Sequence, residues 1–254
     1  MPLHYARALT APLRSRRANR HLGCILAFVA GASNAGGFLA VRQYTSHMTG
    51  MLSSLAGDLA LGGAGLALQA GAAIVCFLFG AACTALLVNY ARRRALAATY
   101  ALPLLLEALL LLAFGVLGAR LSAFESLFVP ATVMLLCFMM GLQNALMTKL
   151  SHAEIRTTHM TGIVTDIGIE IGKLLYWNGD AGSALPRVQA DRARLALLCG
   201  LLASFVLGGV AGAFGFHHAG YVATLPLAAL LCLLAIVPAL DDLRAWRGAA
   251  PRPD

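Results

Sequence analysis

The tetrapeptide His47-Met48-Thr49-Gly50 occurs a second time, unchanged, as His159-Met160-Thr161-Gly162. An acid stands eleven residues after each histidine, Asp58 after the first and Glu170 after the second. An identical tetrapeptide followed by an acid at the same distance predicts an internal duplication of the chain.

Two further pairs of segments accompany these repeats in the same order. They are Gly31-Ala32-Ser33-Asn34-Ala35 with Gly141-Leu142-Gln143-Asn144-Ala145, and Leu102-Pro103-Leu104 with Leu225-Pro226-Leu227. Because all landmarks keep their order, we predict two copies, at about residues 21–118 and 127–240.

The composition around the repeats is that of a membrane protein. Of the 254 residues, 59% are hydrophobic and only 12% are charged, and the mean hydropathy is +0.77. Ordinary soluble domains are about 45–50% apolar and about 25% charged. A water-soluble enzyme needs more charged residues than this on its surface, so that class is excluded. A disordered chain is excluded as well, because so apolar a chain does not stay disordered.

A helix needs about 20 mainly apolar residues to cross the hydrocarbon core of a bilayer. Two shorter segments, 47–62 and 159–176, are interrupted by polar residues, and we predict a re-entrant or interfacial half-helix in each. The segments long enough to cross are 21–41, 66–90, 97–118, 127–148, 194–216 and 220–240.

The basic residues predict the orientation. Six crossings with a cytoplasmic N-terminus leave only Arg42 and Arg120 outside, so 17 of the 19 Lys and Arg residues lie inside. This is the asymmetry of the positive-inside rule, and it would be lost if both half-helices crossed. We therefore predict an all-α, polytopic membrane helix bundle with six transmembrane helices and both termini in the cytoplasm.

The predicted organisation is a basic cytoplasmic tail (1–20), one membrane domain (21–240) and a cytoplasmic C-terminal tail (241–254). The net charge of +8 lies mainly at the cytoplasmic face, where it attracts anionic lipid, so no nucleic-acid partner is predicted. Residues 13–32 resemble a signal peptide, but cleavage there would remove part of the first copy. We expect that segment to be retained.

The number of crossings in each copy determines how the copies are related. Three crossings is an odd number, so the second copy enters the membrane from the opposite side, and the repeats are inverted. Inverted repeats with interrupted helices recur in secondary transporters, whose binding sites lie near the membrane midplane. A duplication that only builds a stable bundle is the alternative.

The repeated motifs resemble the YoaK-like family of bacterial inner-membrane proteins, domain of unknown function 1275, over about residues 20–240. The most specific segment is Arg156-Thr157-Thr158-His159-Met160-Thr161-Gly162 with Thr165-Asp166-Ile167-Gly168. The resemblance implies a six-span membrane protein and carries over neither a substrate nor a catalytic residue. Asn34 stands where many members have Asp, so this chain lacks an ionisable group there.

Polar residues recur on one face of each half-helix, opposite apolar residues such as Met51 and Ile163. A polar stripe inside a membrane requires water, a partner or a ligand. The stripes are His47, Ser54 and Asp58 in the first copy, and His159, Asp166, Glu170 and Lys173 in the second.

The half-helix termini are candidate sites as well. Thr49 and Thr161 stand where N-caps are expected, and Gly50 and Gly162 leave room for a solute or another backbone. A helix N-terminus that points into a cavity attracts anions. The alternative is that these residues only terminate the helix and pack against a neighbour.

Glu107 is the only acid at the centre of a predicted full span, and Leu230 stands at the matching position of the second copy. A lone carboxylate there marks a functional interior or an ion path by default. A protonated Glu with one interhelical hydrogen bond is the alternative. Asn34 and Asn144 are predicted either to satisfy backbone groups or to contact a solute.

These features predict a small secondary transporter or permease for a small polar or anionic solute, with His47, His159 and Glu107 as candidates for proton coupling. One alternative is a membrane-embedded metal-binding protein or enzyme that uses the paired histidines and acids, although their spacings are long for one metal site. The other is a non-transporting scaffold or sensor that uses the loop 177–193. Neither a catalytic residue, a cofactor nor a metal ligand is predicted; the partners are the bilayer and the solute, and self-association is left open.

Overall fold

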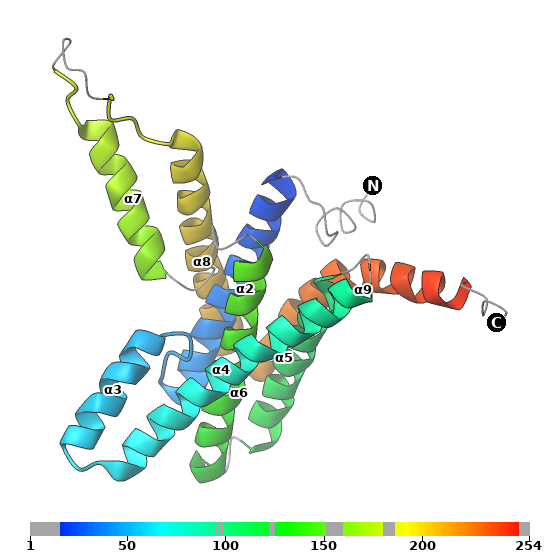
Figure 1. Cartoon of the computed structure of the whole chain (residues 1–254). Coiled ribbons are helices and arrows are strands. Elements are labelled where there is room, and N and C mark those ends of the chain that lie inside the picture. Colours follow the sequence, from blue (N-terminus) through cyan, green and yellow to red (C-terminus); the bar gives the residue numbers. More distant parts are fainter. Residues whose placement is uncertain are drawn as a thin grey trace.

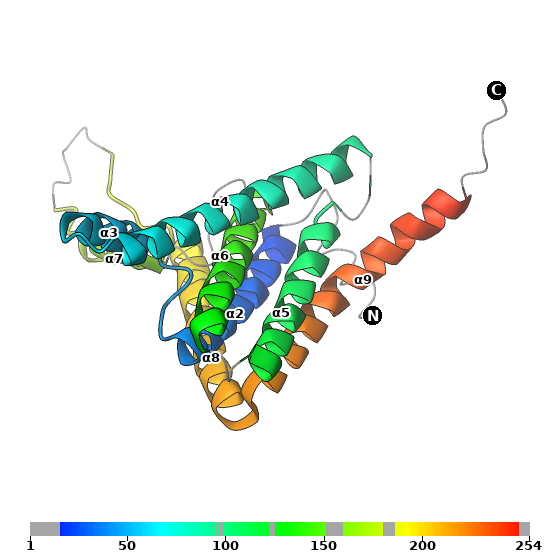
Figure 2. The same ribbon diagram turned by 90° about the horizontal axis from the view of Figure 1, so that it is seen from below.

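The computed structural model describes residues 16–94, 96, 99–121, 125–150, 160–179 and 186–248, and its regular elements there are all helices. The α3–α4 and α7–α8 hairpins project to the left in both views, and α5 and α9 lie to the right (Figures 1 and 2). The helices are α2 (Arg16–Val41), α3 (Met48–Ala60), α4 (Ala64–Arg93), α5 (Ala101–Leu121), α6 (Glu125–Leu150), α7 (Met160–Leu175), α8 (Arg192–Ala219), η1 (Gly220–Ala223) and α9 (Thr224–Gly248).

Each segment that the apolar pattern predicts as a helix is a helix in the structure. The two short ones, α3 and α7, have 13 and 16 residues. At 1.5 Å per residue they are about 20 and 24 Å long, which is less than the hydrocarbon thickness of about 30 Å. The prediction of two short helices beside the long ones is therefore confirmed.

Helix also extends past the apolar segments at both ends of the described chain. α2 begins at Arg16, inside the predicted N-terminal tail, and α9 continues to Gly248, inside the predicted C-terminal tail. Arg, Ala and Leu are strong helix formers, so a helix need not end where its apolar character ends.

α2 and α8 cross in close backbone contact through a reciprocal pair of glycines. A Cβ on Gly31 would overlap the backbone carbonyl oxygen of Phe205, and a Cβ on Gly208 would overlap that of Phe28. Each helix therefore offers a Phe-x-x-Gly segment, whose glycine receives the phenylalanine carbonyl of the other helix. Only a residue without a side chain permits so close a backbone approach.

The same contact recurs between α4 and α6. A Cβ on Gly80 would overlap the carbonyl oxygen of Phe138, and a Cβ on Gly141 would overlap that of Phe77. Gly31 and Gly141 are the first residues of the repeated Gly-x-x-Asn-Ala segment. The repeated glycine thus serves backbone packing in both copies.

Side-chain contacts give the relative directions of these helices. Along α2 and α8, residue numbers rise together, from Cys24 with Gly200 to Gly36 with Phe216, so the two helices are parallel. α2 and α6 are antiparallel. The carbonyl of Leu26 accepts a hydrogen bond from Gln143 Nε2 at 3.2 Å, whereas Gly37, farther along α2, faces the earlier residue Leu136.

Aromatic rings gather where α5 meets the turn between α8 and α9. Phe114 lies 5.8 Å from Phe216 and 5.7 Å from Tyr221, and Tyr221 lies 6.0 Å from Phe128, measured between ring centroids. Such aromatic pairs contribute about 0.5–1.5 kcal/mol beyond the area that they bury. They join α5, α6, α8 and η1 at one end of the bundle.

Apolar side chains cover the outside of the long helices as well as the core. α4 alone exposes Leu66, Leu68, Leu78, Phe79 and Leu86. Soluble proteins rarely expose contiguous apolar surface on this scale, so the helices fit a multi-pass membrane protein. Five segments of the described chain are long and apolar enough to cross: Ala18–Val41, Ala64–Arg93, Ala101–Arg120, Phe128–Lys149 and Arg192–Ile236.

This number is one fewer than the six predicted from the sequence. The reason is that η1 follows α8 and precedes α9 with no residue between them, so Arg192–Ile236 is one continuous segment. The structure therefore shows a polytopic helical bundle with five candidate spans.

Replacing Gly80 by Ala is expected to lower the thermal unfolding temperature of the detergent-solubilised protein. The added Cβ meets the backbone of α6, which cannot rotate away, at a cost of about 1–3 kcal/mol. Gly71→Ala is the matched control on α4, because nothing in the described structure lies within 4 Å of a Cβ there. Both variants gain about 1 kcal/mol in helix propensity. Equal unfolding temperatures would contradict the role of the glycine contact.

Candidate functional site

The residues predicted as sites fall into two regions of the structure. Asn34, Glu107 and Asn144 lie in the long helices α2, α5 and α6. His47, Thr49, Gly50 and Asp58 belong to α3 and its approach, and Thr161, Gly162, Asp166 and Glu170 belong to α7. His159 lies outside the described residues.

The start of α3 differs from the predicted cap. His47 is the residue that precedes the helix, it makes no side-chain capping bond, and Thr49 lies exposed inside the first turn. The prediction of Thr49 as the N-cap is therefore wrong. Thr161 is likewise the second residue of α7, and its carbonyl accepts a hydrogen bond from Thr165 Oγ1 at 2.8 Å.

The glycine after Thr49 makes room for a neighbouring side chain of its own segment. A Cβ on Gly50 would overlap the imidazole ring of His47. The exposed His47 ring is thus one group that makes the close approach predicted for this glycine. Just before α3, Ser46 Oγ donates a hydrogen bond of 3.0 Å to Asn34 Oδ1. Asn34 therefore holds the segment that connects α2 to α3.

The structure also places Asp58, Asn144 and Gly162, the first two with hydrogen bonds at their backbone carbonyls. Asp58 is half-buried near the end of α3, and its backbone carbonyl accepts a hydrogen bond of 2.7 Å from Gly63 N. The backbone carbonyl of Asn144 in α6 accepts a hydrogen bond of 2.8 Å from Thr148 Oγ1. Gly162 is half-buried in the first turn of α7.

In the second copy the predicted acids bind the start of α8. Glu170 is 3% exposed at its side chain, and it accepts hydrogen bonds of 2.8 Å from both Lys173 Nζ and the backbone N–H of Asp191. Asp191 in turn caps α8 by accepting a bond of 2.9 Å from Arg194 N. Asp166 forms an exposed ion pair of 2.8 Å with Arg194.

This arrangement explains the electrostatics of the α7–α8 junction. The hydrogen bond from Lys173 and the one from the Asp191 backbone hold the pKa of Glu170 below its ordinary value of 4.5. Negative charge at a helix N-terminus is also favourable, because the unpaired N–H groups carry partial positive charge. The acidic stripe of α7 therefore fastens α7 to α8.

The metal-site alternative would bring both histidines together with the acids, and His159, one of the two, lies outside the described residues. In the part of the chain that the structure describes, no group of three or more His, Cys, Asp and Glu side chains is placed to hold a metal ion. Asp166 and Glu170 are instead engaged with Arg194, Lys173 and the start of α8.

The interior of the bundle holds polar groups that the sequence analysis identified only in part. Glu107 in α5 is fully buried, and neither of its carboxyl oxygens has a hydrogen-bond partner within the described structure. The same is true of Ser33 Oγ in α2, and of Thr132 Oγ1 and Gln143 Oε1 in α6. Buried polar atoms without partners are rare and mark places where water, an ion or a ligand can bind.

Ser33 and Gln143 were not predicted as site residues. They stand at matching positions, each directly before the asparagine of its repeated Gly-x-x-Asn-Ala segment. The signal in the sequence that could have identified these two residues was their matching position in the two repeated segments. Hydrophobic periodicity does not reveal that a small or amide side chain is buried. The burial of Ser33 and Gln143 is therefore known only from the structure.

Replacing Glu170 by Gln is expected to reduce the hydrogen-exchange protection of α7 amides at pH 7, because the charged partner of Lys173 and of the Asp191 N–H is lost. A group whose pKa is lowered by folding stabilises above its ordinary pKa and loses this effect as the pH falls. The difference from wild type should therefore shrink as the pH falls below 4.5, the ordinary pKa of the carboxyl group.

Asp166→Asn is the control for this experiment. Its ion pair is exposed, with 54% and 39% of the two side chains accessible, and such pairs contribute only about 0–1 kcal/mol. Equal loss of hydrogen-exchange protection in the two variants at pH 7 would contradict the conclusion that Glu170 makes the main contact between α7 and the start of α8.

Comparison with known proteins agrees with the resemblance drawn from the repeated motifs. No curated protein and no solved structure matches the chain. The model of the family described as "Protein of unknown function (DUF1275)" matches residues 22–237, which is most of the chain. The chain therefore belongs to the DUF1275 family.

Proposed function

We propose that this chain is a small secondary transporter or permease for a small polar or anionic solute. Its six crossing helices form two inverted repeats, with both termini on the cytoplasmic side of the bacterial inner membrane. In each repeat a short helix, α3 or α7, lies between the first and second crossings. The directions of the helices support the topology, and a buried carboxyl group supports the transport function.

The antiparallel arrangement of α2 and α6 supports a crossing count without α3. If α2, α4 and α5 cross, α6 is the fourth crossing and runs opposite to α2, as the contacts Leu26–Gln143 and Gly37–Leu136 require. If α3 crossed as well, α6 would be the fifth crossing and would run parallel to α2. The parallel pair α2 and α8 likewise supports a count in which α7 does not cross.

The final candidate segment is long enough for two crossings. Gly220 has φ +58° and begins the short helix η1, which separates α8 from α9. α8 has 28 residues and α9 has 25, and about 20 suffice for one crossing. A turn at this point returns the chain across the membrane and makes six crossings.

The inversion of the repeats is supported by the matched helices. α2 and α6 carry the repeated Gly-x-x-Asn-Ala segments and are antiparallel, as expected for an axis in the membrane plane. The Leu-Pro-Leu segments also match, because Pro103 and Pro226 are each the third residue of their helix, in α5 and α9. Proline is tolerated there because first-turn N–H groups have no partner within the helix.

Labelling of single cysteines with a membrane-impermeant maleimide tests the topology. Leu61→Cys, in the exposed α3–α4 turn, should react from outside intact spheroplasts. Arg94→Cys, at the end of α4, should react only after permeabilisation, because the positive-inside rule places the Arg92–Arg94 cluster in the cytoplasm. Protection of Leu61→Cys in intact cells would mean that α3 crosses, and the proposed topology would be wrong.

One observation carries the transport proposal: the buried Glu107. It lies in a candidate span, is 0% exposed, and has no partner for either carboxyl oxygen within the described structure. Such a group is costly in a membrane, and a Gln or Leu would fill the position at lower cost. Its presence there supports a role in which the carboxyl group takes up and releases a proton or meets a polar solute.

The buried hydroxyl of Ser33 and amide of Gln143 add to this support. They lie on the antiparallel pair α2 and α6, which belong to different repeats. Binding sites of inverted-repeat transporters lie where the two repeats meet. We therefore place the solute path along the α2–α6 contact and Glu107.

Flux into proteoliposomes tests the function. We expect wild-type protein to move at least one member of a panel of amino acids, carboxylates, hexoses and inorganic phosphate faster than protein-free liposomes, with a pH-sensitive dye recording proton movement. Glu107→Gln should abolish the dependence of this flux on an imposed pH gradient. No flux above the protein-free level for any solute would contradict the proposal.

Glu107→Leu separates function from folding in the same assay. Leucine is the residue at the matching position 230, and removing a buried carboxyl without a partner is expected to stabilise the fold by about 1–3 kcal/mol. Raised thermal stability with lost flux is the expected result. Lowered stability would show that the carboxyl group serves the fold.

A non-transporting scaffold or sensor is the second candidate. The connection between α7 and α8 exposes Trp177 and Tyr176 at 87% and 59%, and Asn178 is bonded to both backbone groups of Val188 at 2.9 and 3.0 Å. Exposed aromatic rings beside these hydrogen-bonded residues are suited to a partner. Absence of flux together with pull-down of a partner that depends on Trp177 would favour this function.

A further inference from the structure

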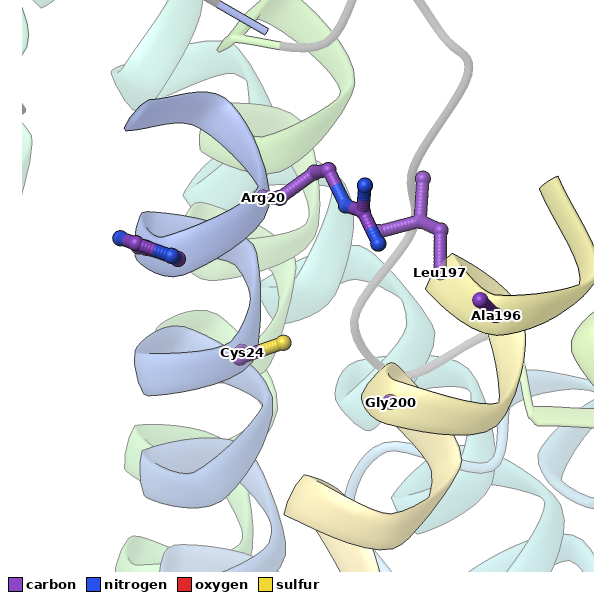
Figure 3. Close-up of a pocket in the computed structure, with 6 residues that line it drawn as sticks. Arg20, Cys24, Ala196, Leu197 and Gly200 are labelled. Carbon is purple, nitrogen blue, oxygen red and sulfur yellow. The ribbon is translucent and has the colours of Figure 1, made fainter. Parts of the chain in front are cut away.

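A pocket separates the N-terminal ends of α2 and α8. Its volume is about 440 Å³, which is within the range of small-ligand sites, and it is open to the surface. The lining residues are Arg20, His21, Cys24, Ala196, Leu197 and Gly200 (Figure 3). None of them belongs to the proposed solute path.

The position of the pocket places it near the edge of the hydrocarbon layer. α2 and α8 are parallel, so their N-terminal ends lie at the same side of the bundle. Both helices are candidate spans, from Ala18 and from Arg192 onward. The pocket residues occupy the first turns of these spans, where apolar helix meets the headgroup layer.

The walls combine a cationic rim with an apolar floor. Arg20 is exposed and extends from α2 across the gap toward Leu197 on α8, and Cys24 points toward Gly200 (Figure 3). Neither of the ion pairs found among the described residues, Glu170–Lys173 and Asp166–Arg194, uses Arg20. Its guanidinium group is therefore placed to receive an anion at the pocket mouth.

The floor of the pocket is open because Gly200 has no side chain. A Cβ on Gly200 would meet only Cys24 Sγ, at 3.8 Å, which is ordinary van der Waals contact. A larger residue could therefore be accommodated next to Cys24, but it would occupy the pocket. Gly200 thus provides a way to block the pocket without disturbing the helix crossing at Gly208.

We propose that this pocket binds the phosphate group of an anionic phospholipid from the adjoining leaflet. Arg20 donates hydrogen bonds to the phosphate oxygens, since a planar guanidinium matches phosphate geometry. The glycerol and upper acyl chain lie along Cys24, Leu197 and Gly200. A soluble phosphate shares the charge, but it has no apolar part to cover this floor. The site is independent of the proposed transport.

Binding to the full chain in detergent tests the proposal. Phosphatidylglycerol should raise the thermal unfolding temperature, whereas phosphatidylethanolamine and inorganic phosphate should have little effect. Arg20→Gln and Gly200→Leu should each weaken phosphatidylglycerol binding about tenfold, through loss of a charge-assisted contact and loss of space. Arg93→Gln, which removes an exposed arginine at the end of α4, should leave it unchanged.

Alkylation of the native thiols gives a second readout at the pocket itself. Phosphatidylglycerol should slow the reaction of Cys24 with maleimide, quantified by peptide mass spectrometry, while the exposed Cys199 on α8 reacts as before. Equal protection by inorganic phosphate would assign the site to a soluble anion. No protection of Cys24, or equal effects of Arg20→Gln and Arg93→Gln, would overturn the proposal.

Discussion

The architecture depends on close backbone contact at glycine in four helices. α2, α4, α6 and α8 each contain a Phe-x-x-Gly segment, and each glycine receives the phenylalanine carbonyl of its partner helix. Within lipid, helices gain little from burying apolar side chains against one another, so association depends on close packing. The two reciprocal contacts pair α2 with α8 and α4 with α6. They therefore join the first half of the chain to the second and determine how the remaining helices are placed.

The two halves share this frame and differ in their polar groups. The connection from α3 to α4 is a tight turn at Leu61–Gly63, whereas α7 is joined to α8 by a longer segment and by Asp166 and Glu170. Glu107 has Leu230 as its counterpart. Gly31 and Gly141, which are equal in both halves, serve the packing. Glu107, which has no acidic counterpart, is the buried group on which the proposed function rests.

Much of the fold could be predicted because bilayer dimensions impose a simple length requirement. Apolar segments of about 20 residues predicted the long helices. The two shorter segments with polar residues among the apolar ones predicted α3 and α7. The prediction of Thr49 as the N-cap of α3 was wrong, because the first residue of a helix depends on local backbone geometry. The residue types near His47 and Thr49 do not specify that geometry. Glu107 was found from its apolar surroundings. Ser33 and Gln143 were missed because burial of a polar side chain depends on which helix covers it.

The sequence by itself determined the class of protein, the helical segments and the repeated motifs, since these follow from composition, length and repetition along one chain. The tertiary structure alone decided which helices meet. α2 packs against α8 of the other half, because their glycines permit backbone contact that side chains elsewhere prevent. It also decided that Glu170 binds the start of α8 and that Glu107 is left without a partner within the described structure. Such outcomes depend on distances between segments remote in sequence, which no local pattern records.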